Sequence, residues 1–174
     1  MLDIAGRREI FWDSYILEPS LTDASVRLHE PIRQEAVAVH DRPWEGDGSN
    51  YHNLLCDDGL IRMYYLGWEM MSQDKTRHTT AGIRVCYMES TDGRHWTKPE
   101  LGLFEFEGSK RNNILFDPQA FNFDNFMVMR DDHPACPPEE RYKGIAYYKD
   151  RSLWCFTSPD AIHFQPGWQL FDRN

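Results

Sequence analysis

The residues best suited to chemistry occur twice in this sequence. Ser90, Asp92 and His95 belong to the motif "STDGRHW", and the same three residue types return 68 residues later in "SPDAIHF". Carboxylates and imidazoles serve as catalytic groups and metal ligands, but these histidines have no partners at metal-ligand spacing. Ser and Asp side chains at such spacing accept hydrogen bonds from backbone N–H groups two or three residues on. The motif therefore predicts two equivalent structural turns and no metal site.

Other chemical signatures are absent from the sequence. It has no Gly-rich phosphate loop, no His-Glu-x-x-His and no Gly-x-Ser-x-Gly, and we expect no cofactor. Its cysteines are far apart and form no Cys-x-x-Cys pair, which argues against a structural zinc site. Cys56, Cys86 and Cys155 fall in strand-like runs, where a buried free thiol is the simplest interpretation.

Composition narrows the class of protein. The 174 residues include 28 acidic and 19 basic side chains, a net charge of -9, which argues against nucleic acid and anionic membrane surfaces as partners. No apolar run approaches the roughly 20 residues of a membrane span. The N-terminal stretch lacks the apolar core of a secretory signal. We therefore expect a cytoplasmic protein.

Short strands dominate the predicted secondary structure. They are aromatic or β-branched runs bounded by Gly, Pro, Asp or Asn. "CPPEERYK" has room for one helical turn after Pro138, and no longer helix is indicated. The predicted strands are "REIFWDSYIL", "NYHNLLC", "LIRMYYLGW", "GIRVCYMES", "NFMVMR", "YKGIAYY" and "SLWCFTS".

The repeated motif organises these strands into two copies of one unit. Each copy reads strand, turn, strand, loop, strand, Asp-turn, strand, and the aromatic that ends the turn, Trp96 or Phe164, is expected to pack between sheets. Such repetition of a four-stranded meander predicts an all-β fold with antiparallel blades of the β-propeller type, incomplete at about two blades. The expected boundaries are an N-terminal segment 1–43, a blade 44–116 and a blade 117–174.

The stretch "SNYHNLLCDDGLIRMYYLGW" reads as the inner hairpin of the first blade. Asp58-Gly59 tolerates positive φ, so it suits a two-residue turn between two strands. The first strand of each blade would line the central axis, where propellers bind ligands. The second copy of that strand lies in "FNFDNFMVMRDD".

Three stretches carry a resemblance to a known superfamily: "RMYYLGW", "CYMESTDGRHWTKPELGLFEFEGSKRNNILF" and "DDHPACPPEERYKGIAYY". They resemble the five-bladed propeller glycosidases of the invertase, levansucrase and arabinanase type, nearest to an uncharacterised bacterial group that shares the opening seen here as "FWDSYIL". The resemblance runs from about Phe11 to Phe164 and implies a carbohydrate substrate. It also implies glycoside hydrolysis by two carboxylates that titrate differently.

The resemblance also suggests catalytic positions. Asp124 falls where a second-blade aspartate would orient the sugar or tune the acid, although its flanking residues differ from the family motif. Asp47 is the nearest first-blade acid to the family's nucleophile, but Asn50 aligns about as well, and Asp13 is an alternative from the N-terminal strand. Each also has a simpler interpretation: Asp124 as a turn cap, Asp13 as a solvated strand residue, and Asp47 as a loop acid.

Four further residues are predicted to contact substrate. Trp44 is a candidate sugar-stacking platform, with a loop anchor as the alternative. Tyr51, His52 and Asn53 alternate along the presumed inner strand, so Tyr51 and Asn53 would face away from His52. His52 is a candidate hydrogen-bonding partner for a sugar.

Length leaves the function open between two hypotheses. A propeller needs at least four blades, and this chain supplies about two. It is therefore a fragment of a longer enzyme, a subunit of a homo-oligomer that completes the ring, or a small sandwich. One hypothesis is a glycoside hydrolase-like protein, and the other is a non-catalytic carbohydrate-binding or assembly module. The sugar, the linkage and the stereochemistry cannot be deduced from the sequence.

Overall fold

The computed structural model describes Gly6, Ile10 and residues 12–72, 74–116, 125–148 and 152–171. The chain divides into two compact units, Met1–Glu35 and Ala36–Asn174. The described helices are single 3-10 turns, and none of them has the length or apolarity to cross a membrane.

The N-terminal unit corrects one strand prediction. The described part of "REIFWDSYIL" contains bends and turns but no strand, and a short 3-10 turn, η1 (Pro19–Leu21), follows it. Trp12 is 85% exposed and Tyr15 is 84% exposed. An extended run forms a strand only when a neighbouring strand pairs with it and its apolar side chains are covered. The described residues provide neither condition for this run.

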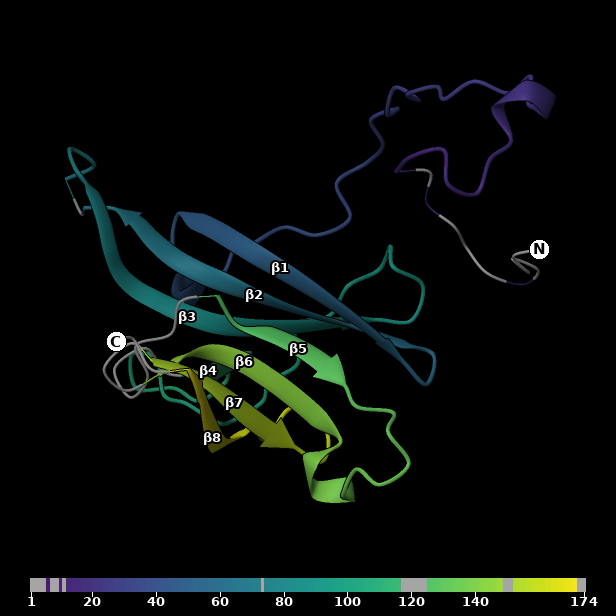
Figure 1. The fold of residues 1–174 in the computed structure, drawn as a ribbon. Coiled ribbons are helices and arrows are strands. Elements are labelled where there is room, and N and C mark those ends of the chain that lie inside the picture. The colour runs from purple at the N-terminus through teal and green to yellow at the C-terminus, as the bar shows by residue number, and fades with distance from the viewer. Residues whose placement is uncertain are drawn as a thin grey trace. The chain divides into compact units, whose positions relative to one another are not determined.

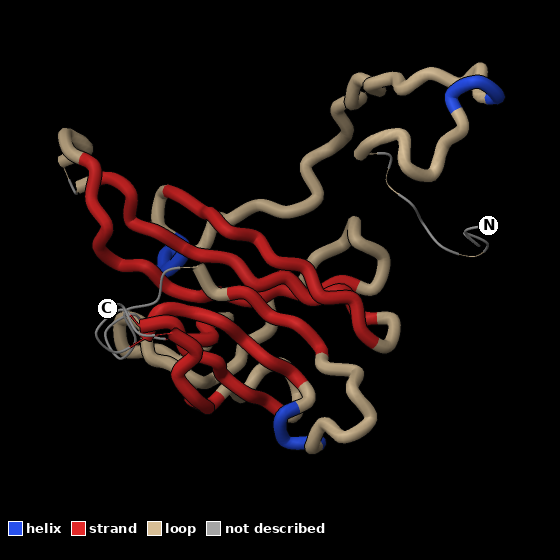
Figure 2. The backbone as a smooth tube through the Cα atoms, in the orientation of Figure 1, coloured by secondary structure: helices blue, strands red, loops and turns tan. Residues whose placement is uncertain are grey.

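The second unit contains two four-stranded antiparallel sheets, as Figures 1 and 2 show. In both sheets the strands follow one another in chain order, β1-β2-β3-β4 and β5-β6-β7-β8. This up-and-down meander is the topology of a propeller blade, which confirms the predicted fold class. The strands are β1 (Gly48–Asp57), β2 (Leu60–Met71), β3 (His78–Ser90), β4 (Ile114–Phe116), β5 (Met127–Arg130), β6 (Tyr142–Tyr148), β7 (Ser152–Ser158) and β8 (Gln165–Phe171). The short helices are η2 (Pro43–Glu45) and η3 (Pro138–Glu140), the latter at the predicted helical turn.

The predicted hairpin joins β1 to β2. Asp57 pairs with Leu60, so the loop is the two residues Asp58 and Gly59. Their φ angles are 49° and 79°, the positive values that a type I′ turn requires at both positions. The Asp-Gly signal therefore predicted the turn correctly.

A β-bulge interrupts β1 near its start. The register shifts between Asn50 and Asn53, where Tyr51 and His52 together oppose Tyr65. Tyr51 has a φ of 54°, a left-handed conformation that is uncommon for a residue with a bulky side chain. Strict alternation therefore does not hold between Tyr51 and Asn53, because a bulge adds a residue to one strand.

The two Ser–Asp–His turns, which we call the first corner (Ser90–Trp96) and the second corner (Ser158–Phe164), share the following contacts. In the first corner, Ser90 Oγ accepts from the backbone N–H of Asp92 at 3.2 Å. Asp92 Oδ1 accepts from the backbone N–H of His95 at 2.8 Å, and Asp92 Oδ2 lies 2.7 Å from His95 Nδ1. The equivalent distances in the second corner are 3.2, 2.8 and 2.7 Å. The structural role predicted for both motifs is confirmed.

Two apolar clusters cover different faces of the first sheet. The inter-sheet cluster lies between the two sheets and consists of Tyr64, Leu66, Val85, Tyr87, Leu115, Phe116, Phe126, Val128, Tyr142, Ala146, Phe156, Ala161 and Phe164. The outer cluster lies on the other face of the first sheet and consists of Tyr65, Cys86, Met88 and Ile114, with Trp44, Trp96, Phe104 and Phe106 packed against them. Phe164 thus packs between sheets as predicted, whereas Trp96 packs on the outer cluster.

Polar contacts also join the two sheets. Asp57, 5% exposed at the end of β1, forms an ion pair with Arg130 of β5 and accepts a hydrogen bond from the Tyr142 hydroxyl of β6. Asn53 Oδ1 accepts from the backbone N–H of Val128 at 2.7 Å. The first strands of the two sheets, β1 and β5, therefore lie side by side.

The thiols are free, as predicted, but one is not buried. Cys86 and Cys155 are buried in β3 and β7, whereas Cys56 is exposed and Cys136 is half-buried. The prediction for Cys56 was wrong because β1 is an edge strand, with a second strand paired on one side only.

Candidate functional site

The three predicted catalytic carboxylates belong to different parts of the chain. Asp124 lies outside the described residues. Asp13 belongs to the N-terminal unit, where its Oδ1 accepts a hydrogen bond from the backbone N–H of Tyr15 at 2.8 Å. That contact is a local turn of the kind that Asp side chains commonly form.

Asp47 is tied to the neighbouring strand. Its Oδ1 accepts from the backbone N–H groups of Met70 and Met71 at 2.8 and 3.3 Å, and its Oδ2 forms an ion pair with Lys75. The Lys75 ammonium and the two backbone donors lower the pKa of Asp47. Asp47 is therefore an ionised carboxylate that holds the end of β2 beside the start of β1.

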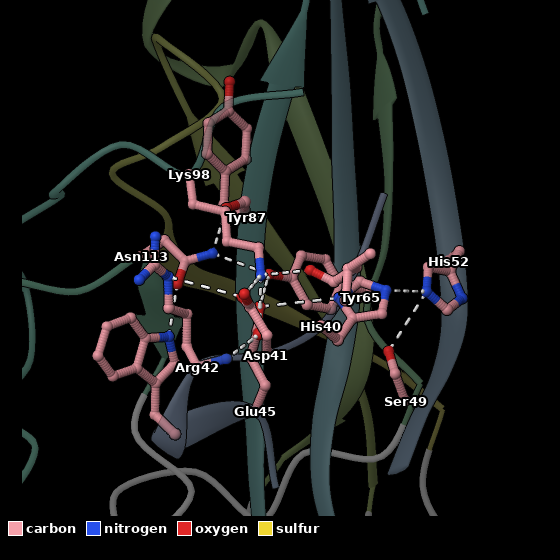
Figure 3. Close-up of polar contacts among 12 residues, drawn as sticks. His40, Asp41, Arg42, Glu45, Ser49, His52, Tyr65, Tyr87, Lys98 and Asn113 are labelled. Atoms are coloured by element: carbon pink, nitrogen blue, oxygen red, sulfur yellow. Dashed lines mark hydrogen bonds and ion pairs between the residues drawn. The ribbon is translucent and has the colours of Figure 1, made fainter. Parts of the chain in front are cut away.

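A buried polar cluster lies behind the start of β1, centred on Glu45 (Figure 3). Pro43 begins the 3-10 turn η2, and Gly46, with a φ of 69°, ends it. The turn packs directly on β2 because Gly67 has no side chain. A Cβ there would lie 2.8 Å from the Cα of Glu45. This close approach places the Glu45 side chain, 0% exposed, inside the first sheet's outer layer.

Several donors converge on the Glu45 carboxylate (Figure 3). Tyr65 donates its hydroxyl proton to Oε1, Lys98 Nζ lies 2.8 Å from Oε2, and the backbone N–H of Arg42 donates to Oε2 at 2.8 Å. Burial opposes the charge, but His40, Lys98, Tyr65 and Arg42 outweigh it and lower the pKa of Glu45 to about 2. Glu45 is thus a buried anion that positions its neighbours and cannot itself reach a solute.

A pair of histidines extends the cluster to the surface. His40 Nδ1 lies 3.7 Å from Glu45 Oε1, and His40 Nε2 lies 3.0 Å from His52 Nε2, which is also 3.3 Å from Ser49 Oγ. The ring of His52 stacks on Tyr65, with centroids 5.9 Å apart and planes 7° apart. Partial burial and the neighbouring His40 lower the pKa of His52, which keeps its imidazole neutral near pH 7. A neutral imidazole can donate from one nitrogen and accept at the other.

Of the residues predicted to contact a substrate, two are held by other parts of the protein and two are exposed. Trp44 Nε1 donates to Asn113 Oδ1 at 2.6 Å, and the Trp44 ring packs edge-on against Phe106 with centroids 6.1 Å apart. The side-chain oxygen of Asn53 is engaged by the second sheet. Tyr51 and His52 are exposed at the bulge, and Tyr51 is 51% exposed. Of the four predicted contacts, these two are accessible to a ligand.

The sequence did not predict the polar cluster itself. His40 and Glu45 come from the segment before β1, whereas Tyr65 comes from β2 and Lys98 from the segment after β3, so no local spacing connects the three segments. Pro43 and Gly46 mark a turn, which is the available local signal. A glutamate after a proline is usually solvated, so its burial follows from the packing of η2 on Gly67.

Comparison with known proteins gives structural similarity only. No protein-family model and no curated protein match this chain. A protein described as a candidate glycoside hydrolase from Parabacteroides distasonis matches 68% of this chain and 31% of its own, with 19% identity and a TM-score of 0.43.

Two further solved structures match similarly. One is from work on GH130 mannoside phosphorylases and glycoside hydrolases that target beta-1,2 mannosidic linkages in Candida mannan. It matches 75% of this chain and 34% of its own, with 16% identity and a TM-score of 0.45. The other is a glycosyl hydrolase from Bacteroides ovatus, which matches 68% of this chain and 29% of its own, with 21% identity and a TM-score of 0.37. This chain therefore spans about a third of the length of the structures that it matches.

Proposed function

We propose that this protein is glycoside hydrolase-like and binds a carbohydrate at the bulged start of β1. The observation that carries the proposal is the exposed imidazole of His52, held at the surface by stacking on Tyr65 and by the contact with His40. The sequence resemblance to propeller glycosidases supplies the substrate class. Tyr51, exposed beside His52, adds an aromatic face of the kind that packs on the apolar face of a sugar ring.

The arrangement suits a neutral polyol because its hydrogen-bonding groups are fixed. His52 Nε2 is held by His40 and Ser49, and a ligand that meets the remaining, preorganised ring nitrogen costs the protein less conformational entropy on binding. The buried Glu45 anion and the Lys98 ammonium compensate each other and therefore present little net charge to the surface. An uncharged sugar is better matched to this surface than a phosphorylated or acidic ligand.

Hydrolysis would require two carboxylates at a defined separation. Carboxyl groups about 5 Å apart give retention, and groups about 6.5–9.5 Å apart give inversion. We propose Asp124 as the residue that orients the sugar or tunes the acid. Asp47 is proposed as base or nucleophile rather than acid, because the Lys75 contact keeps its carboxylate ionised. Asp13 remains the alternative to Asp47.

A non-catalytic carbohydrate-binding module is the second candidate function. Asp47 already bonds to Met70, Met71 and Lys75, and a carboxylate committed to such contacts is less available as a nucleophile. In this alternative the His52 surface binds the sugar in the same way, but no complete acid pair acts on it.

Two measurements test these candidates. NMR titration with a panel of neutral oligosaccharides should show binding that weakens about tenfold or more in His52→Ala, since a hydrogen bond and a stacked ring are lost. His163→Ala, which removes an exposed histidine from the second corner, is the matched control and should bind normally. Absence of binding by the wild type to every sugar would overturn the proposal.

An aryl-glycoside screen then separates enzyme from binding module. Hydrolysis that is lost in Asp124→Asn and in Asp47→Asn supports the enzyme. Sugar binding without any hydrolysis supports the non-catalytic module. Hydrolysis at wild-type rates in both variants would show that neither carboxylate acts on the substrate.

A further inference from the structure

Two histidines from separate segments face each other beside the start of β1 (Figure 3). His40 precedes η2 and His52 lies at the bulge of β1, and their Nε2 atoms are 3.0 Å apart. Ser49 Oγ lies 3.3 Å from the same nitrogen of His52. Imidazole nitrogens are common ligands of zinc, copper and nickel ions in proteins. The pair therefore has the residue types of a transition-metal site, although no sequence motif connects the two histidines.

The separation of the two nitrogens is close to the value that a metal ion requires. Zn–N bonds are about 2.0–2.1 Å long, so two imidazoles on a tetrahedral zinc ion hold their nitrogens about 3.3 Å apart. The 3.0 Å between His40 Nε2 and His52 Nε2 is slightly shorter, and a small rotation of the exposed His52 side chain covers the difference. The same separation suits an N–H···N hydrogen bond, so the groups behind the two rings decide what the pair can hold.

The group behind His40 sets its tautomer. His40 Nδ1 is buried, has no hydrogen-bond partner among the described residues, and lies 3.7 Å from Glu45 Oε1. A proton on Nδ1 faces this carboxylate favourably, whereas a lone pair there would be repelled by its negative charge. His40 therefore carries its proton on Nδ1 and directs the lone pair of Nε2 toward His52. A carboxylate beyond the other ring nitrogen is the usual outer partner of a metal-ligating histidine.

Tyr65 holds both imidazole rings in place. Its ring centroid is 4.4 Å from that of His40 and 5.9 Å from that of His52. Its hydroxyl donates to Glu45 and accepts from Asn113 Nδ2 at 2.8 Å, and the residue is 1% exposed. Packing on a fixed ring orders both nitrogens before a ligand arrives, which lowers the entropic cost of binding.

Protein groups would fill only part of the coordination sphere of a metal ion here. Among the residues that the structure describes, no group of three His, Cys, Asp or Glu side chains is arranged to hold a metal ion. The protein's share is therefore the two imidazoles and the Ser49 hydroxyl, and a tetrahedral ion keeps at least one position for a solvent or solute oxygen. An open position is typical of catalytic rather than structural zinc sites. The net charge of -9 favours the approach of a cation.

We propose that His40 and His52 bind a divalent transition-metal ion of the zinc type between their Nε2 atoms, with Glu45 as the outer partner of His40. The ion takes the place of the hydrogen bond between the two rings. His52 then carries its proton on Nδ1, which stays available to a ligand at the surface. The metal site therefore does not depend on the carbohydrate site, and either can fail without the other.

Zinc titration of the whole chain, followed through the imidazole nitrogen signals in long-range ¹H–¹⁵N NMR spectra, tests this proposal. We expect saturable shifts of the Nε2 signals of both His40 and His52. This readout is specific to each imidazole, so zinc bound by the exposed thiol of Cys56 does not contribute to it. Magnesium prefers oxygen ligands and should leave both imidazoles unchanged at the same concentration.

A pair of matched variants separates the metal site from a hydrogen bond. His52→Gln keeps a hydrogen-bonding side chain but removes the imidazole, and it should weaken zinc binding at His40 by about 100-fold or more, because loss of an outer partner alone costs about 10- to 100-fold. His163→Gln, which removes an exposed histidine paired with Asp160, should leave zinc binding at the pair unchanged.

Circular dichroism establishes that the variants keep the fold, and the wild-type spectra decide the outcome if His52→Gln unfolds. Unchanged Nε2 signals of both histidines at about 1 mM zinc would overturn the proposal. So would equal shifts with magnesium, or wild-type zinc affinity at His40 in His52→Gln.

Discussion

Among the residues that the structure describes, the first sheet is covered on both faces, whereas the second is covered on one. Tyr64, Leu66 and Val85 of the first sheet pack on the second, and Tyr65, Cys86 and Met88 belong to its outer cluster, which Trp44, Trp96, Phe104 and Phe106 cover. In the second sheet, the side that points away from the inter-sheet cluster holds exposed residues such as Tyr147, which is 42% exposed. One repeated strand pattern therefore gives two environments. The side chains that cover the outward face of the first sheet come from outside the strands.

Glu45 holds together the polar cluster on the outward face of the first sheet. Replacing Glu45 should therefore give the largest loss of stability. Glu45→Ala leaves Lys98 without its buried partner and should lower the free energy of unfolding by about 3–5 kcal/mol. Asp41→Ala removes the exposed partner of the same Lys98 and should cost less than about 1 kcal/mol. Urea denaturation of both variants measures the difference. Equal losses would show that the buried carboxylate has no special role in covering the first sheet.

The two corners hold different residues, Gly93 and Ala161, at a left-handed backbone position, and exchanging these two residues tests what the difference costs. Gly93 has a φ of 73° and its equivalent Ala161 has a φ of 67°, so only the second corner holds a side chain in the left-handed region. Gly93→Ala should lower the free energy of unfolding by about 1 kcal/mol, because a residue with a Cβ is strained in the left-handed conformation. No steric clash adds to this cost, because the new Cβ would meet only Ile61 Cδ1 at an ordinary 3.5 Å.

The reverse exchange should change stability little. Ala161→Gly relieves about 1 kcal/mol of backbone strain but removes a fully buried methyl group worth about 0.8 kcal/mol. Thermal denaturation of the two single variants tests this pair of expectations. A large loss in Ala161→Gly would mean that the methyl contact, not the backbone, dominates the second corner.

The ion pair of the first corner should give the smallest effect, visible as a pH dependence. Asp92 raises the pKa of His95, and His95 lowers the pKa of Asp92. The His95 contribution is therefore fully present below its unfolded pKa of about 6.5 and is lost as pH rises through its raised folded pKa. The Asp92 contribution is present above its unfolded pKa of about 3.9 and is lost as pH falls through its lowered folded pKa.

The corresponding measurement compares melting temperatures across pH. The wild type should exceed His95→Gln by its largest margin between about pH 4 and 6.5, and the margin should shrink at higher pH. A difference in melting temperature that grows as the pH rises above 7 would have the opposite sign and would contradict a stabilising ion pair.

The sequence predicted those parts of the fold that rest on local rules. Asp58-Gly59 specified its own turn, and the Ser–Asp spacing specified both corners, because each needs only residues that are close in the chain. The run around Trp12 has the aromatic and β-branched composition of a strand, and the sequence therefore predicts a strand there. Its state depends on whether a partner strand covers it, which composition does not encode.

The polar cluster could not be predicted for the same physical reason. Glu45 meets Lys98 and Tyr65 across separations that no local spacing rule covers. The alternation expected along β1 also failed where the bulge places Tyr51 and His52 opposite one residue of β2. The sequence identified His52 as a candidate sugar contact, but it did not identify His40, which contacts His52.

The central claim is that two equivalent sheets pack with their first strands side by side. Hydrogen exchange at the Val128 amide tests it most directly, because that N–H donates to the Asn53 side chain of the other sheet. We expect this amide to exchange at least about tenfold more slowly in the wild type than in Asn53→Ala. Fast exchange of the Val128 amide in the wild type, equal to that in Asn53→Ala, would contradict the account.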